Sequence, residues 1–472
     1  MKPNGLMAEI LPEGERRSRV EQTLWRGLNR RRSFNSGALS DCKNVDTTFL
    51  PALRGAREPV VSATGYTDVL GAYAAENMLF IIYKSGTRIL ADLRRGTSVF
   101  TGILSENAAE DNEMRCVVAF NRYSTPLDPL SGTYEKQLLV FPDCKCCQAD
   151  CTADFTFADL AGESDMPRIR YATVYLSRVF GVDGDRVYAS AFNDPSDWEL
   201  DTSEDISAQN AWATTSQSDT RAIGGFTAVA CCDGCAVCFR GDYMQQIYNN
   251  KNPFRLVDIG SWGCLDNAAH CVWNNTLAFA SSNGIWLYSG GYPKCISDPL
   301  AISDFTGTRL AAGRDLLYAY VPSEGRIFVY ENTGESWGER ALSDVSLLTG
   351  DGESVYAFCK DGRVLKLDEG DYGSFSLTSD SMTLGVVNPK KLKGIAVTAQ
   401  LGEGAALEIE ALIGDQSVTV ASSCSPGLQV IRSALNVTRS DFAGFRFSGY
   451  GKVDLFGLSI SYAKTEHAGG AG

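Results

Sequence analysis

The chain has 472 residues, of which 44% are hydrophobic and 21% are charged, a balance typical of soluble globular proteins and not of disordered or membrane chains. Its 43 lysines and arginines against 57 aspartates and glutamates give a formal net charge of −14. This charge argues against a general nucleic-acid binder, because affinity for a phosphate backbone comes largely from cationic contacts. The negative charge is still compatible with passage of a DNA duplex through a channel, because an acidic wall repels the phosphates and lets the DNA slide.

The sequence contains no run of about 18 apolar residues, so we expect no transmembrane helix and no membrane insertion. The first residues lack the apolar core of a secretory signal, which indicates synthesis in a cytoplasm. The 46 glycines, 19 tyrosines and 22 phenylalanines favour β-structure with many turns.

Residues 1–33 form a first segment that is rich in arginine. Val20, Leu24 and Leu28 recur every four residues, which predicts a short amphipathic helix or an arm. An arm of this kind either docks on a partner subunit or stays a loose, solvated terminus. The residues that follow, up to Pro59, predict an extended strand that closes a repeat ring by joining its last unit.

A repeated hairpin dominates residues 34–372, which we assign to a propeller that includes the strand leading into the ring. Each copy has an apolar run, a tight turn rich in Gly, Asp or Asn, and a second apolar run. The three clearest copies lie in residues 171–297, and units at a period of roughly 40 to 50 residues are typical of a β-propeller. One candidate unit is irregular, so the prediction is six or seven blades, with residues 144–166 as a loop reaching out of the ring.

The pattern changes after Gly373 to short alternating strands, which predict a C-terminal β-sandwich over residues 373–463. Residues 464–472 have almost no apolar content and are expected to be a disordered tail. The predicted fold is therefore all-β: a propeller of six or seven blades followed by a sandwich, with a short N-terminal helix or arm.

Signals of catalysis are sparse. The only histidines are His270 and His467, which disfavours Ser-His-Asp and Cys-His hydrolases and the commoner histidine metal sites. We expect His270, at the start of an apolar run, to be a packed or rim histidine. Neither a G-x-x-x-x-G-K-[ST] loop nor a G-x-G-x-x-G turn between a strand and a helix is present. We predict no catalytic residues, no cofactor and no enzymatic activity.

Two cysteine clusters have alternative interpretations. A zinc site takes four thiolates, usually from two C-x2-C turns, and the first cluster could supply them alone or with the second. Disulfides formed after release from the cell are another, with Cys231 and Cys238 facing each other across a turn. Buried or rim thiols are the favoured interpretation, because cysteine packs as a small apolar residue, and no metal site is predicted. The clusters comprise Cys144, Cys146, Cys147 and Cys151, and Cys231, Cys232, Cys235 and Cys238.

Carboxylates crowd into residues 194–205. They could hold calcium or form a glycosidase pair, although the 12-residue calcium-loop pattern is not matched. A solvated loop between blade strands is the favoured interpretation, since turns select Asp, Asn and Pro for backbone reasons alone. The acidic residues are Asp194, Asp197, Glu199, Asp201, Glu204 and Asp205.

Residues 25–57, 187–199, 239–250 and 263–297, together with the closing sandwich, resemble the tail nozzle or tail hub proteins of short-tailed bacteriophages, sometimes called DNA-stabilisation proteins. The resemblance covers nearly the whole chain after Trp25. It implies a structural virion protein of the tail with no catalytic residues, assembled as a homo-oligomeric ring, a hexamer, beneath the portal and its adaptor.

Such a ring would contact the portal adaptor and other tail proteins, close the portal channel after packaging and form part of the DNA ejection conduit. Double-stranded DNA would pass without sequence-specific binding. The alternative from a different class is a propeller-type glycan-binding or glycan-hydrolysing protein, with residues 194–205 or aromatic side chains at the ring mouth as its site. A bacterial propeller scaffold unrelated to phage is a third possibility.

Overall fold

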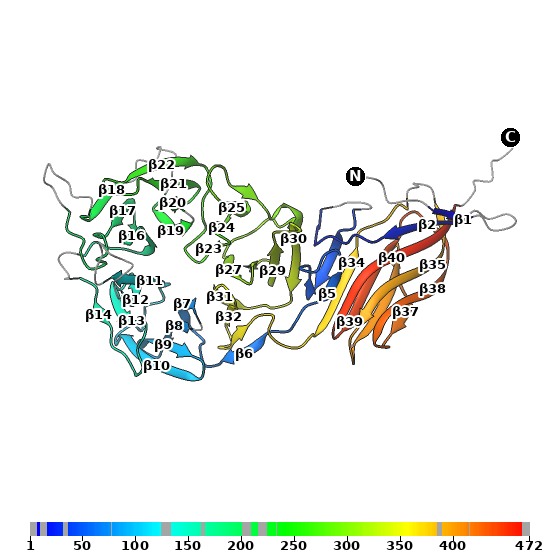
Figure 1. Cartoon of the computed structure of the whole chain (residues 1–472), viewed down its shortest axis with the longest axis horizontal. Helices are drawn as coiled ribbons and strands as arrows, with labels where there is room; N and C mark the ends of the chain where they lie inside the picture. Colours follow the sequence, from blue (N-terminus) through cyan, green and yellow to red (C-terminus); the bar gives the residue numbers. More distant parts are fainter. Residues whose placement is uncertain are drawn as a thin grey trace.

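The computed structural model describes residues 7–9, 17–31, 36–76, 78–123, 134–161, 166–200, 209–215, 224–232, 234–384, 389–414 and 416–464. Over these residues the regular elements are β-strands, apart from one 3-10 turn, η1 (Asp298–Leu300). The molecule is elongated, with a propeller at one end and a β-sandwich at the other (Figure 1). None of the helical structure in this part of the chain is long and apolar enough to cross a membrane.

Seven four-stranded antiparallel blades form the propeller within the described residues. The predicted number of blades, six or seven, is therefore seven. Blades one to three comprise β7 (Val69–Ala75), β8 (Met78–Ser85), β9 (Arg88–Arg95) and β10 (Ser98–Ser105); β11 (Cys116–Tyr123), β12 (Tyr134–Phe141), β13 (Lys145–Gln148) and β14 (Ala158–Asp159); and β15 (Tyr171–Tyr175), β16 (Arg178–Asp183), β17 (Arg186–Ala189) and β18 (Trp212–Thr215).

Blades four to seven follow in chain order around the ring. They comprise β19 (Phe226–Cys232), β20 (Cys235–Arg240), β21 (Tyr243–Tyr248) and β22 (Arg255–Gly260); β23 (His270–Trp273), β24 (Thr276–Ser281), β25 (Gly284–Tyr288) and β26 (Lys294–Cys295); β27 (Arg309–Gly313), β28 (Leu316–Val321), β29 (Arg326–Glu331) and β30 (Ser336–Arg340); and β31 (Val345–Gly350), β32 (Val355–Cys359), β33 (Val364–Lys366) and β6 (Val60–Ala63).

The hairpin between the first two strands of a blade depends on a tight turn. Asn274 and Asn275 both have positive φ, as a two-residue turn matched to strand twist requires. Leu176 and Ser177 take the same conformation in blade three, where no asparagine or glycine signals it. The second strand then reads as an almost continuous apolar run, because neighbouring blades cover both of its faces.

A strand N-terminal to the first blade closes the ring, as predicted, but it is β6, directly after the segment ending at Pro59 to which we assigned it. Residues 39–43, 45–46 and 53–55 of that segment instead form strands of the sandwich and of the sheet that joins it to blade six. Strand β6 pairs antiparallel with β33 of the last blade. The innermost strands contact one another in order, including β31 with β7, so the ring is complete. The pairing of β6 with β33 covers the outer edge of β33, which would otherwise be exposed.

The N-terminal helix is a wrong prediction. Residues Arg17–Gln22 form strand β2, which pairs with β1 (Met7–Glu9) and with β40 (Val453–Lys464) of the same chain. Of the periodic residues, Leu24 is 57% exposed whereas Leu28 is buried in the core beside Trp25, so Val20, Leu24 and Leu28 do not share one buried face. Pairing with the edge of β40 outweighs a helical period that spans only two turns.

The prediction that residues 144–166 are a loop reaching out of the ring is also wrong, because two blade strands lie within them. Strands β13 and β14 are the outer strands of blade two, and Cys147 of β13 is buried in the core between blades one and two. These strands are short and carry polar and cysteine side chains, so they lack the apolar alternation that marks the inner strands.

The sandwich is formed by two sheets, and N-terminal strands complete both. One sheet has the order β3-β34-β39-β36-β37, and the other contains β2-β40-β35-β38. Strand β40 also pairs with β5, β5 with β4, and β4 with β30, so one hydrogen-bonded sheet runs from the sandwich into blade six. The remaining bounds are β3 (Leu39–Lys43), β4 (Val45–Asp46), β5 (Leu53–Gly55), β34 (Ser374–Ser379), β35 (Lys390–Leu401), β36 (Ala406–Ile413), β37 (Gln416–Ser423), β38 (Gly427–Ser440) and β39 (Gly444–Tyr450).

Candidate functional site

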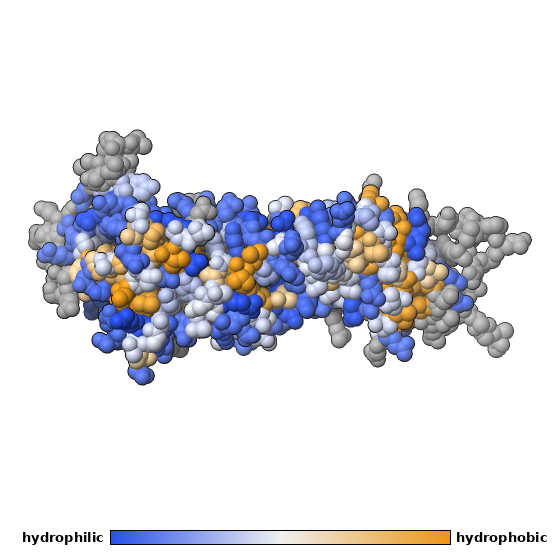
Figure 2. All heavy atoms as spheres, turned by 90° about the horizontal axis from the view of Figure 1, so that it is seen from below, coloured by the Kyte–Doolittle hydropathy of each residue, from blue (hydrophilic) through white to orange (hydrophobic). Residues whose placement is uncertain are grey.

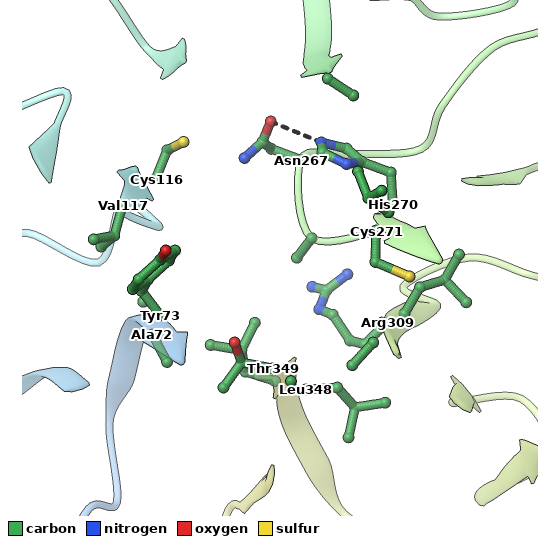
Figure 3. Close-up of a pocket in the computed structure, with 18 of the residues that line it drawn as sticks. Ala72, Tyr73, Cys116, Val117, Asn267, His270, Cys271, Arg309, Leu348 and Thr349 are labelled. Atoms are coloured by element: carbon green, nitrogen blue, oxygen red, sulfur yellow. Dashed lines mark hydrogen bonds between the residues drawn. The ribbon is translucent and has the colours of Figure 1, made fainter. Parts of the chain in front are cut away.

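The innermost strands of all seven blades surround a cavity of about 900 Å³ at the centre of the ring (Figure 3). Each blade contributes at least one lining residue, so the cavity depends on the closed ring and on no single loop. Central cavities of this kind are where propellers expose side chains from every repeat to one ligand. It is therefore the candidate site that the fold itself defines.

Polar side chains project into the cavity from different blades. Figure 3 shows Tyr73, Asn267 and Arg309 directed toward its open centre, with Thr349 on the wall between Tyr73 and Arg309. Burial raises the pKa of Tyr73, so its hydroxyl stays protonated and can donate or accept a hydrogen bond. The cavity thus offers hydroxyl, amide and guanidinium groups to a ligand.

Two carboxylates at the cavity are bound to arginines. The Arg309 guanidinium lies 2.8 Å from the Asp266 carboxylate, and that of Arg170 lies 2.9 Å from the Glu113 carboxylate. A glycosidase needs one protonated carboxylic acid and a second carboxylate on the other side of the scissile bond. Both of these carboxylates are engaged in ion pairs, an arrangement that favours polar binding over acid–base chemistry.

A buried arginine, Arg115, forms part of the cavity wall. The Arg115 side chain is only 2% exposed and bonds Asp111 at 2.5 Å and Asp143 at 2.8 Å. Hydrogen bonding from Arg115 lowers the pKa of Asp111 to about 2. Burial alone would lower the pKa of Arg115, but the two carboxylates outweigh it and raise that pKa. This cluster holds the loop before β11 at a fixed distance from blade two.

His270 lies in the cavity wall at the start of β23. Its Nε2 is 3.2 Å from Oδ1 of Asn267, and burial lowers its pKa to about 4. The imidazole is therefore neutral at pH 7 and holds the Asn267 amide in place. His467, the other histidine, lies outside the described residues.

Asp194, Asp197 and Glu199, the acidic residues of the stretch 194–205 that the structure describes, do not line the cavity. Asp194 forms an ion pair with Arg122, and Asn193 exchanges two hydrogen bonds with the backbone of Tyr123. Oδ1 of Asp197 accepts from the backbone N–H of Glu199, a turn interaction. These contacts fasten blade three to blade two. Asp201, Glu204 and Asp205 lie outside the described residues.

The two cysteine clusters lie in different parts of the propeller core. In the described part of the chain, no group of three or more His, Cys, Asp or Glu side chains is placed to hold a metal ion. The expectation that Cys231 faces Cys238 is wrong, because the register pairs Cys231 with Ala236 and Cys238 with Val229. The cross-strand pair is instead Cys232 with Cys235.

The cavity residues Tyr73, Asn267 and Arg309 were not singled out from the sequence. Each lies in or just before the innermost strand of its blade, and they are far apart in the chain. To find them from the sequence, one would have to know which strand of each repeat is the innermost one.

Comparisons with known proteins give no family for this chain. No family model matches it, and no curated protein matches it. Among solved structures, it is similar to the WD40 domain of Toxoplasma gondii coronin, with 11% identity, a TM-score of 0.41, and coverage of 69% of this chain and 87% of that one. A computationally designed protein, Ika8, gives 12% identity, a TM-score of 0.38, and coverage of 66% and 99%.

An exo-β-1,3-galactanase of Phanerochaete chrysosporium gives 9% identity, a TM-score of 0.25, and coverage of 85% of this chain and 100% of that one. These similarities are too low to bear on function. What the described strands themselves establish is the class of fold, an all-β propeller with a β-sandwich.

Proposed function

We propose that this chain is a structural protein of a bacteriophage tail, a nozzle or hub that works through shape and assembly. The observation that carries the proposal is the sheet shared by the sandwich and blade six. Arg340 of β30 donates to the carbonyl oxygen of Val45 at 2.8 Å, and Arg54 of β5 binds Asp454 of β40 through two hydrogen bonds. These contacts join the propeller and the sandwich through one continuous sheet, which suits a ring component that must keep its shape under mechanical force.

Open strand edges on the sandwich support assembly with other chains. Strands β37 and β38 are each the last strand of their sheet, and within the described residues neither has a second ladder partner. The two strands do contact each other, and the Ser433 hydroxyl of β38 donates to the carbonyl oxygen of Val420 on β37. Val418, Leu428 and Val430 on these strands are exposed, and Figure 2 shows apolar residues gathered on the sandwich. Exposed edges with apolar side chains are surfaces on which another chain can add.

In the proposed ring, DNA would pass between copies and not through one propeller. The propeller cavity of about 900 Å³ is enclosed by seven blades and is smaller than one turn of a DNA duplex. A conduit would therefore lie on the common axis of a homo-oligomer, for which the family resemblance implies a hexamer placed beneath the portal and its adaptor. A net charge of −14 fits passage without tight binding.

Detection in phage particles tests this proposal. An antibody against the purified protein, used on particles purified from the source culture, is expected to label the tail, and image reconstruction is expected to show the elongated propeller and sandwich repeated around the tail axis. Absence of the protein from purified particles would contradict the proposal. A monomer in solution would not, since such a ring can depend on its partner for assembly.

Glycan binding at the central cavity is a second candidate. The inward-facing hydroxyl, amide and guanidinium groups of Tyr73, Asn267 and Arg309 favour it, because such groups can form hydrogen bonds with the hydroxyls of a neutral sugar. Binding on a glycan array that is lost in Asn267→Ala and retained in Asp197→Asn, which alters only the turn outside the cavity, would support this candidate. Hydrolysis of a bound glycan would make the chain an enzyme.

A further inference from the structure

The hairpin between β19 and β20 brings two cysteines into contact. Cys232 and Cys235 are cross-strand partners on either side of the turn, and their Sγ atoms are 3.2 Å apart. Gly234 in the turn has a φ of +71°, which lets the chain reverse within two residues. A small movement of the two side chains would bring the sulfurs to bonding distance.

Neighbouring cysteines do not compete for this pairing. Cys231 lies on the opposite face of β19, lines the central cavity and is paired with Ala236. Cys238 is fully buried and directs its Sγ to the carbonyl oxygen of Gln245 at 3.7 Å.

The tip of this hairpin lies against the adjoining blade. Tyr175 at the end of β15 donates its hydroxyl to the carbonyl oxygen of Gly234 at 2.9 Å. Cys232 and Cys235 are 5% and 6% exposed, while Gly234 between them is exposed. The pair is therefore held in place by packing, yet it lies directly below a surface turn that a small oxidant can reach.

We propose that Cys232 and Cys235 are a modification site that forms an intrachain disulfide when the protein meets a low-molecular-weight disulfide such as glutathione disulfide. The thiolate of one cysteine attacks the glutathione disulfide and releases one glutathione thiol. The other cysteine then attacks the protein-bound sulfur of the mixed disulfide and releases the second glutathione. The two protein thiols lose two electrons and two protons, and the oxidant gains both.

This bond would covalently link strands β19 and β20 of blade four at the turn that contacts Tyr175 of blade three. The inner strand β19 lines the central cavity, so the staple would stiffen one part of the ring wall. The inference goes beyond the proposed structural function and does not depend on it.

Peptide mapping of the full-length protein tests the proposal. Protein is incubated with glutathione disulfide or with dithiothreitol, denatured in iodoacetamide, and digested without reduction. After oxidation, Cys232 and Cys235 are expected to escape alkylation in a species lighter by two hydrogen atoms than the unalkylated dithiol. After dithiothreitol, both are expected to be alkylated.

Two variants separate the pair from its neighbours. Cys231→Ser is expected to keep the bond, whereas in Cys232→Ser the remaining Cys235 is expected to be alkylated or to retain a glutathione. The proposal is overturned if both cysteines of the oxidised wild-type protein are alkylated, if either retains glutathione, or if either is bonded to another cysteine. The oxidised wild-type protein alone decides the test, so the proposal stays falsifiable even if a variant folds poorly.

Discussion

The propeller and the sandwich are both built from β-strands, but the strands pair over very different distances along the chain. In each blade, the ladders join strands that follow one another in the chain, except that, among the described strands, β6 pairs with β33 and β4 pairs with β30. In the sandwich, β40 pairs with β2, with β5 and with β35, so its strands come from both ends of the sequence. The propeller is therefore a structure of mostly local contacts, whereas the sandwich depends on contacts between residues far apart in the chain, which cost more loop-closure entropy.

Removing Trp337 is expected to have the largest effect, because this residue lies where the two regions meet. It is buried on β30, donates its indole N–H to the carbonyl oxygen of Ile296 at 2.7 Å, and contacts the ring of Tyr330. Trp337→Ala should lower the free energy of unfolding by about 4 kcal/mol. Denaturant titration followed by two probes, one in each region, measures this loss.

If the shared sheet couples the two regions, both probes should shift together in Trp337→Ala. Trp337→Phe, which keeps much of the buried ring, should show a smaller shift of the same kind. A variant that moved the propeller transition alone would show that the regions unfold independently.

An ion pair in each region gives a second comparison. Arg115→Ala in the propeller leaves Asp111 and Asp143 without their common partner, and because Asp111 is partly solvated we expect a loss of about 2 kcal/mol. Arg446→Ala removes the surface pair with Glu410 on the sandwich and should cost under about 1 kcal/mol. Thermal unfolding of both variants checks the ranking, and equal losses would contradict it.

The difference between local and long-range pairing explains what the sequence allowed us to predict. Hairpins such as residues 276–288 carry their own turn and apolar runs, so the propeller and the ring-closing strand could be predicted from local pattern. The pairing of β2 with β40 joins residues more than 400 positions apart, and nothing near Val20 signals it. The cavity residues were missed for the same reason, because Tyr73, Asn267 and Arg309 meet only when the ring closes.

The histidine in the cavity wall should make the propeller sensitive to acid. His270 has a pKa lowered by burial to about 4 against an ordinary value of 6.5, although nearby Asp266 acts in the opposite direction. Below pH 6.5 the unfolded chain takes up a proton that the folded chain does not, so stability falls as the pH drops toward about 4. The slope is at most about 1.4 kcal/mol per pH unit, and above pH 6.5 this residue contributes no pH dependence.

Comparison with His270→Gln isolates this effect. Titratable groups that do not interact with residue 270 contribute equally in both proteins, so the difference between their unfolding midpoints should be constant above pH 6.5. Below pH 6.5 the midpoint of the wild-type protein should fall relative to that of the variant. Parallel curves from pH 7 to pH 4 would show that the imidazole accepts a proton in the folded state.

The smallest effect on stability is expected at the sandwich edge, where the largest effect on assembly should occur. Leu428 on β38 is 69% exposed, so Leu428→Ser removes little buried area and should change the free energy of unfolding by less than about 0.5 kcal/mol. If β38 is a surface on which a second chain adds, the same change should weaken self-association, measured by light scattering over a concentration series. Tyr292→Ser, an exposed site on the propeller, is the matched control and should leave association unchanged. Loss of association in the control alone would place the interface on the propeller and not on the sandwich. It would then be wrong that the propeller, with its local pairings, forms only the ring wall while the sandwich, with its long-range pairings, supplies the contacts between chains.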